Sequence, residues 1–137
     1  MGDDRAGMNA RNTVLVIEDE AAVRRTIVRM LQIEGFDVAE ARDGSEAVHI
    51  YAERSAEIVA ATLDMMMPNT DGRETLAMLS QFAPDLPIVV STALPQPDNL
   101  IGRVPGTRAV GYLQKPYTPR QLSAELRRVI AEAAGPA

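Results

Sequence analysis

Residues 14–20 read V-L-V-I-E-D-E, four apolar residues followed directly by three acidic ones. A short, continuous apolar run is typical of a β-strand that is buried on both faces of a parallel sheet. The change to acidic residues at Glu18 indicates that the strand ends at Ile17. The stretch therefore predicts a buried strand that carries carboxylates at its carboxyl end.

The same pattern, an apolar run followed by polar residues, recurs along the chain. Asp64 follows one run, Ser91 and Thr92 follow the next, and Lys115 and Pro116 follow the last. Between the runs, apolar residues recur at helical spacing. The predicted strands span residues 14–17, 36–41, 58–63, 88–90 and 109–113, and the predicted helices span residues 21–34, 45–54, 71–81 and a last segment that begins at residue 119.

Three local signals predict where helices begin, end or fail. Gly35 stands where the first helix should stop. Thr118 and Gln121 form a T-x-x-Q capping box around Pro119, which predicts the start of the last helix. Residues 95–106 contain three prolines and two glycines, the poorest helix formers, so we expect a short or irregular fourth helix there.

Strands that alternate with helices predict a doubly wound α/β fold, a five-stranded parallel sheet flanked by five helices. A chain of 137 residues is the size of one domain with one core. We expect residues 1–12 to be a polar N-terminal lead and residues 13–134 to form the domain.

The composition argues against several classes of function. A formal charge of -5, from 14 basic and 19 acidic residues, argues against direct nucleic-acid binding as the main activity. The absence of cysteine and the single His49 exclude disulfides, thiolate metal sites and histidine-rich zinc sites. No stretch approaches the ~20 apolar residues of a membrane span, so we predict no membrane association and a cytoplasmic location.

The predicted strand ends bring together an unusual set of side chains. In open α/β sheets, ligands bind beyond the carboxyl ends of the strands, where Glu18, Asp19, Asp64, Thr92 and Lys115 are all expected. Three carboxylates within ~5 Å of one another would repel by roughly 3 kcal/mol per pair at an effective dielectric constant of about 20. A cation would offset this repulsion, and a set of oxygen ligands without imidazole or thiolate favours Mg²⁺.

Carboxylates, Mg²⁺, a hydroxyl and an ammonium group together indicate phosphoryl transfer. Lys115 is the only lysine among 14 basic residues, which marks a position where a compact ammonium is needed. The chain has no G-x-x-x-x-G-K-[ST] loop for a nucleotide. The remaining interpretation is that a carboxylate itself accepts the phosphoryl group as an aspartyl phosphate.

Four segments carry these residues in order: V-L-V-I-E-D-E at 14–20, L-D-M-M-M-P-N-T-D-G at 63–72, S-T-A at 91–93 and G-Y-L-Q-K-P-Y at 111–117. Together they resemble the CheY-like receiver domains of response regulators in two-component signal transduction. The resemblance runs from about residue 13 to about residue 133. It implies a flavodoxin-like fold with the strand order 2-1-3-4-5.

The resemblance also implies roles for the residues of the site. Asp64 corresponds to the phosphoacceptor. Glu18 and Asp19 correspond to the acidic pair that holds Mg²⁺ together with Asp64 and the backbone carbonyl of Met66. Glu18 departs from the commoner aspartate but keeps the carboxylate, so we expect Mg²⁺ binding to survive.

The remaining implied roles concern switching and partners. Lys115 corresponds to the lysine that pairs with the phosphoryl group, Thr92 to the hydroxyl that moves toward it, and Tyr112 to the aromatic switch residue. The implied phosphodonor is a histidine kinase or a histidine phosphotransfer protein, and the downstream protein partner is unknown. We expect a self-phosphorylating switch, and not an enzyme that turns over a substrate.

Two alternatives remain open. The first is a pseudo-receiver that docks proteins without being phosphorylated, against which the complete set of acidic, hydroxyl and lysine residues argues. The second is a Mg²⁺-dependent phosphatase with Asp64 as nucleophile. Such enzymes usually carry a second aspartate two residues later, where this chain has Met66.

Charged residues outside this set have structural interpretations. We expect Arg24, Arg25 and Arg29 to form a solvated face of the first helix, the helix that touches the partner in the family. We expect His49 to lie half-buried beside the apolar face of the second helix.

Overall fold

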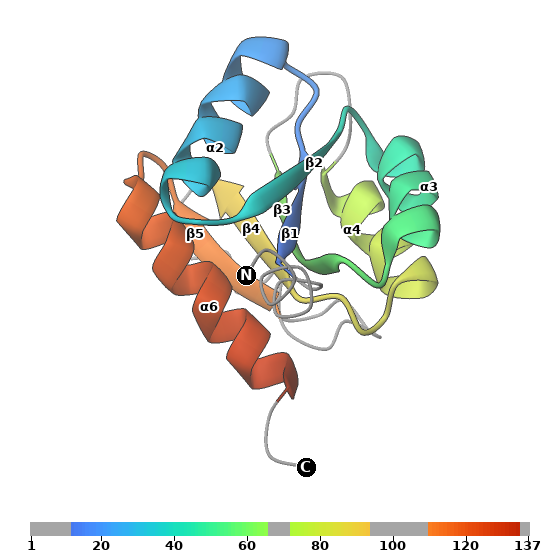
Figure 1. The fold of residues 1–137 in the computed structure, drawn as a ribbon. Helices are drawn as coiled ribbons and strands as arrows, with labels where there is room; N and C mark the ends of the chain where they lie inside the picture. Colours follow the sequence, from blue (N-terminus) through green and yellow to red (C-terminus); the bar gives the residue numbers. More distant parts are fainter. Residues whose placement is uncertain (1–11, 66–71, 94–109, 135–137) are drawn as a thin grey trace.

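The computed structural model describes residues 12–65, 72–93 and 110–134. Within these ranges, five strands form one parallel sheet in the order β2-β1-β3-β4-β5, with helices on both sides (Figure 1). The strands are β1 (Thr13–Ile17), β2 (Asp37–Ala41), β3 (Ile58–Asp64), β4 (Ile88–Thr92) and β5 (Val110–Gln114), and the helices are α2 (Ala21–Ile33), α3 (Gly44–Arg54), α4 (Gly72–Phe82) and α6 (Pro119–Ala134).

Within the described residues, two helices cover each face of the sheet, and each face has its own core. Helices α2 and α6 lie together on one face, and α3 and α4 lie together on the other (Figure 1). Side chains alternate along β1, so that Val14 and Val16 pack toward α2 and α6, whereas Leu15 and Ile17 pack toward α3 and α4. This alternation explains why residues 14–17 of β1 are all apolar, since both faces of a covered parallel sheet are buried.

The predicted α/β fold and strand order are confirmed, and the local signals explain several element ends. Gly35 has φ of +94° just after α2, a conformation that glycine adopts without strain. At the start of α6, Gln121 N–H donates to Thr118 Oγ1 (3.1 Å) and Thr118 N–H donates to Gln121 Oε1 (2.8 Å), which is the predicted capping box. The expected short fourth helix, at residues 95–106, lies outside the described residues.

Two predictions for charged residues are wrong. His49 is exposed, with its Nε2 3.3 Å from Glu53 Oε2 one turn later on α3, because it points away from the apolar face and not along it. Arg24 is only 16% exposed and does not join a solvated face with Arg25. None of the helices in the described ranges is both long and apolar enough to cross a membrane.

Candidate functional site

The carboxyl ends of β1, β3 and β4 place buried polar side chains at the same edge of the sheet. Asp64 ends β3 and pairs in register with Ser91 of β4, and Glu18 follows the last residue of β1. Strand alternation directs Asp64 and Ser91 to the face covered by α2 and α6, since Ala60 and Val89 pack on that face. The polar site therefore lies at the end of the apolar core that the sheet forms with α2 and α6.

A salt bridge joins the ends of β3 and β5. Lys115 Nζ donates to Asp64 Oδ2 at 2.6 Å, with the aspartate side chain 7% exposed and the lysine side chain 32% exposed. Two backbone bonds extend the strand pairing toward this contact, from Met65 N–H to the Ser91 carbonyl and from Lys115 N–H to the Thr92 carbonyl, both 2.9 Å. The single lysine of the chain thus contacts the predicted phosphoacceptor, across 51 positions of sequence.

Glu18 is the most deeply buried acid of the site. Its side chain is inaccessible to solvent, and its Oε2 accepts a hydrogen bond from Glu20 N–H at 3.0 Å. Its Oε1 is buried and makes no hydrogen bond within the described part of the chain. Burial, with smaller contributions from the charge of Asp64 and from side-chain contacts with Asp64 and Asp19, raises the pKa of Glu18 to about 8, although the bond from Glu20 N–H opposes the rise.

These acids form a candidate cation site. One carboxylate oxygen from each of Glu18, Asp19 and Glu20 lies within 4.8 Å of the others, and Asp64 is close enough to interact with Glu18. The donor set is all oxygen, and a buried oxygen of Glu18 lacks a donor, so the residues fit a hard cation such as Mg²⁺. The predicted fourth ligand, the carbonyl of Met66, lies outside the described residues.

The two predicted switch residues lie on the opposite face of the sheet. Thr92 is 1% exposed at the end of β4, and alternation with Ser91 directs it toward α3 and α4. Tyr112 of β5 is half-buried, packs against the core on that face, and pairs in register with Val90, two residues before Thr92. Thr92 and Tyr112 therefore lie on the same face of neighbouring strands, two positions apart in register.

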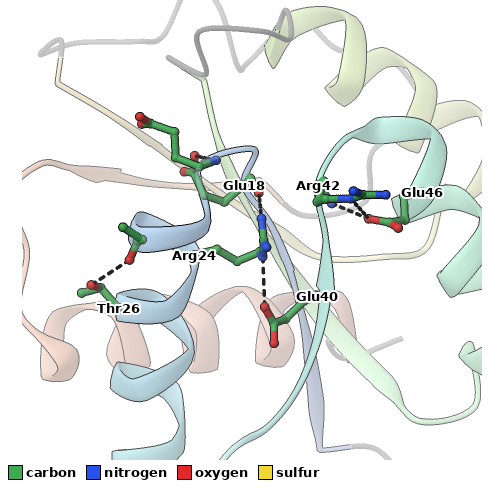
Figure 2. Close-up of polar contacts among 8 residues, drawn as sticks. Glu18, Arg24, Thr26, Glu40, Arg42 and Glu46 are labelled. Carbon is green, nitrogen blue, oxygen red and sulfur yellow. Dashed lines mark hydrogen bonds and ion pairs between the residues drawn. The ribbon is translucent and has the colours of Figure 1, made fainter.

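Tyr117 and Arg24 also belong to the site, although sequence reasoning left both out. Burial raises the pKa of Tyr117 to about 12, with a further rise from the charges of Asp64 and Glu18, and its hydroxyl hydrogen-bonds the side chain of Ser91. Arg24 bonds the backbone of Glu18 (Figure 2). A sequence signal existed for Arg24, because its spacing to Ile27 and Leu31 is that of the buried stripe of α2.

Comparisons with known proteins agree on one family. The family model described as the response regulator receiver domain matches residues 14–127. The response regulator MprA of Mycobacterium sp. (strain KMS) is 38% identical over 119 residues, which are 85% of this chain and 50% of that protein. The sensor kinase CckA of Brucella abortus (strain 2308) is 34% identical over 118 residues, which are 86% of this chain and 12% of that protein.

Solved structures give the same result. In the CheX–CheY–BeF₃–Mg²⁺ complex of Borrelia burgdorferi, a chain 25% identical to this one superposes with a TM-score of 0.75, over 88% of this chain and 90% of that chain. This chain spans about half the length of the first curated relatives that it matches.

Proposed function

The chain belongs to the family of response regulator receiver domains, the phosphoacceptor modules of two-component signalling, and from this premise we propose that Asp64 is the residue that receives the phosphoryl group. The observation that carries the proposal is the buried Asp64 carboxylate held at 2.6 Å by the lone lysine, Lys115. It lies beside a carboxylate cluster at the carboxyl end of the sheet, where open α/β folds bind ligands.

In the proposed reaction, a carboxylate oxygen of Asp64 attacks the phosphorus of a phosphohistidine. The new O–P bond forms as the N–P bond breaks, and the released imidazole nitrogen takes a proton from water. Lys115 orients the carboxylate before the attack and offsets charge on the phosphoryl oxygens afterwards. The Thr92 hydroxyl, at the carboxyl end of β4, donates a hydrogen bond to a phosphoryl oxygen, and Tyr112 then moves on the face of the sheet that it shares with Thr92.

Glu18 and Asp19, with Asp64 and the Met66 carbonyl, are the residues that would hold Mg²⁺. When bound, the cation neutralises charge on the transferred phosphoryl oxygens. The buried Oε1 of Glu18, which has no donor within the described residues, supports this assignment. Glu18 also accepts the hydrogen bond from Glu20 N–H that holds the acidic loop, residues 18–20 after β1.

The partners follow from the family and stay proposals. The phosphodonor is a histidine kinase or a histidine phosphotransfer protein, in keeping with a sensor kinase among the relatives. The domain acts as a cytoplasmic, self-modified switch and not as an enzyme with turnover. The complete set of Asp64, Thr92 and Lys115 disfavours the pseudo-receiver alternative.

Mass spectrometry after incubation with acetyl phosphate and Mg²⁺ tests the proposal. The wild-type protein should gain the mass of one phosphoryl group, and Asp64→Asn should gain none. Asp37→Asn, at the exposed start of β2, is the matched control and should be labelled like the wild type. Equal labelling of Asp64→Asn and the wild type would refute the assignment of Asp64.

A further inference from the structure

Arg24 connects three elements around the acidic loop. It lies one turn into α2, where its own N–H bonds the Glu20 carbonyl at 2.9 Å. Its guanidinium donates from Nη1 to the backbone carbonyl of Glu18 (2.8 Å) and from Nε to Glu40 Oε1 on β2 (3.0 Å). Figure 2 shows the arginine between the two glutamates, apart from the Arg42–Glu46 pair.

The Glu18 carbonyl lies beyond the last hydrogen-bonded pair of β1 and β2. The pairing of β1 with β2 ends at Ile17 and Ala41, and Glu18 N–H makes one more bond, to the Ala41 carbonyl at 3.0 Å. The Glu18 carbonyl is beyond the last paired residue of β2, and Arg24 supplies its hydrogen bond. The planar guanidinium suits this position, since it can donate in two fixed directions at once.

The ion pair with Glu40 does not by itself account for the buried arginine. Glu40 is 51% exposed, and half-exposed ion pairs add little to stability. The bond to the Glu18 carbonyl, in contrast, acts on the residue whose carboxylate has one oxygen bonded to Glu20 N–H and the other without a donor in the described ranges. Arg24 and Glu20 N–H together fix both ends of Glu18.

We propose that Arg24 is a positioning residue for the cation site, which holds the backbone of Glu18 so that its buried carboxylate oxygen faces the acidic cluster. This inference rests on the proposed function, because it takes the cluster as the Mg²⁺ site. Residues that orient metal ligands without touching the metal typically change metal affinity by about 10- to 100-fold when mutated.

The first measurement is Mg²⁺ binding, by calorimetry and by the Mg²⁺ concentration that gives half-maximal labelling from acetyl phosphate. Arg24→Gln should raise the Mg²⁺ dissociation constant and the half-maximal Mg²⁺ concentration about 10-fold each. The extent of labelling at saturating Mg²⁺ should stay within twofold of the wild type. Arg25→Gln, at the exposed neighbour, and Glu40→Gln, which keeps an acceptor for Arg24, should stay within twofold in both measurements. A loss of labelling at all Mg²⁺ concentrations with unchanged affinity would overturn the inference.

The second measurement needs no metal. In chelator, amide exchange at Glu20 reports its bond to Glu18 Oε2, and Arg24→Gln should speed this exchange whereas Arg25→Gln should not. Arg24→Lys keeps the charge and is the variant to use if Arg24→Gln does not fold. It should also weaken Mg²⁺ binding, because an ammonium group cannot replace the planar guanidinium that donates in two fixed directions. Full wild-type affinity in Arg24→Lys would assign the effect to charge and refute positioning.

The two proposals fail in different ways. If Asp64 is not labelled in the wild-type protein, the proposed function fails, yet calorimetry and Glu20 exchange still test Arg24. If the wild type is labelled and Arg24→Gln binds Mg²⁺ like the wild type, the inference about Arg24 alone fails.

Discussion

Glu18 after β1 and Glu125 on α6 are two carboxylates withdrawn from water, and their surroundings differ in almost every respect. Glu125 Oε2 accepts from Tyr112 N–H (2.9 Å) and Arg128 Nη2 (2.8 Å), and its Oε1 accepts from Arg128 Nε (3.1 Å). Glu18 is more deeply buried, has acids as neighbours, and leaves Oε1 without a donor within the described residues.

The pKa shifts express the same difference with opposite sign. Hydrogen bonds from Arg128, in the first place, and from Tyr112 hold the pKa of Glu125 below its usual range. Burial raises the pKa of Glu18 to about 8. Ionised Glu125 therefore stabilises the fold, because it accepts a hydrogen bond from the backbone of β5. Ionised Glu18, in contrast, destabilises the fold. A cost that the fold leaves uncompensated is typical of a functional position.

The largest expected effect is on stability at alkaline pH without metal. Because the folded pKa of Glu18 is raised from 4.5 to about 8, its contribution to stability is present below pH 4.5 and is lost as the pH rises to 8. In chelator, Glu18→Gln should equal the wild type near pH 4.5 and exceed it by about 2–4 kcal/mol at pH 9. Urea unfolding across this range measures the difference, and parallel curves for the two proteins would contradict the account of Glu18.

The second effect concerns the space that Glu125 occupies. A Cβ at Gly111 would lie 2.6 Å from Glu125 Oε2 and 2.7 Å from Val129 Cγ1, so Gly111→Ala should displace Glu125 from Tyr112 and cost about 2 kcal/mol. Gly44→Ala is the control, since its nearest contacts, to Thr75, are 3.1 Å. Unfolding free energies that change equally at the two glycines would remove the special role of the Gly111 contact.

The smallest expected effect distinguishes the hydrogen bond between Tyr112 N–H and Glu125 from an exposed ion pair. Glu125→Gln should cost about 1 kcal/mol, because it weakens charged hydrogen bonds to Tyr112 N–H and Arg128. Glu132→Gln removes only a 59%-exposed partner of Arg128 and should change stability by less than about 0.5 kcal/mol. If the two variants unfold at the same urea concentration, the bond to β5 contributes nothing measurable.

Much of this arrangement follows from the sequence, because parallel strands must present their carboxyl ends at one edge. That rule predicts that Asp64 and Lys115 share one edge of the sheet, and the structure places Lys115 Nζ 2.6 Å from Asp64 Oδ2. Periodicity predicts on which face of a helix or strand a side chain lies, but not which group its polar end will contact. The Tyr117 hydroxyl on Ser91 and the Arg24 bond to the Glu18 carbonyl depend on side-chain conformations that no spacing fixes. The roles of Met66 and of residues 95–106 stay predictions.

The central claim is that the buried Glu18 carboxylate destabilises the acidic loop unless a cation binds there, and one measurement tests it directly. Unfolding free energies with and without Mg²⁺, at pH 8, are compared for the wild type and Glu18→Gln. The account predicts that Mg²⁺ at 100 times its dissociation constant stabilises the wild type by about 2.7 kcal/mol and stabilises Glu18→Gln by less than a third of that amount. Equal stabilisation of both proteins, or of neither, would contradict it.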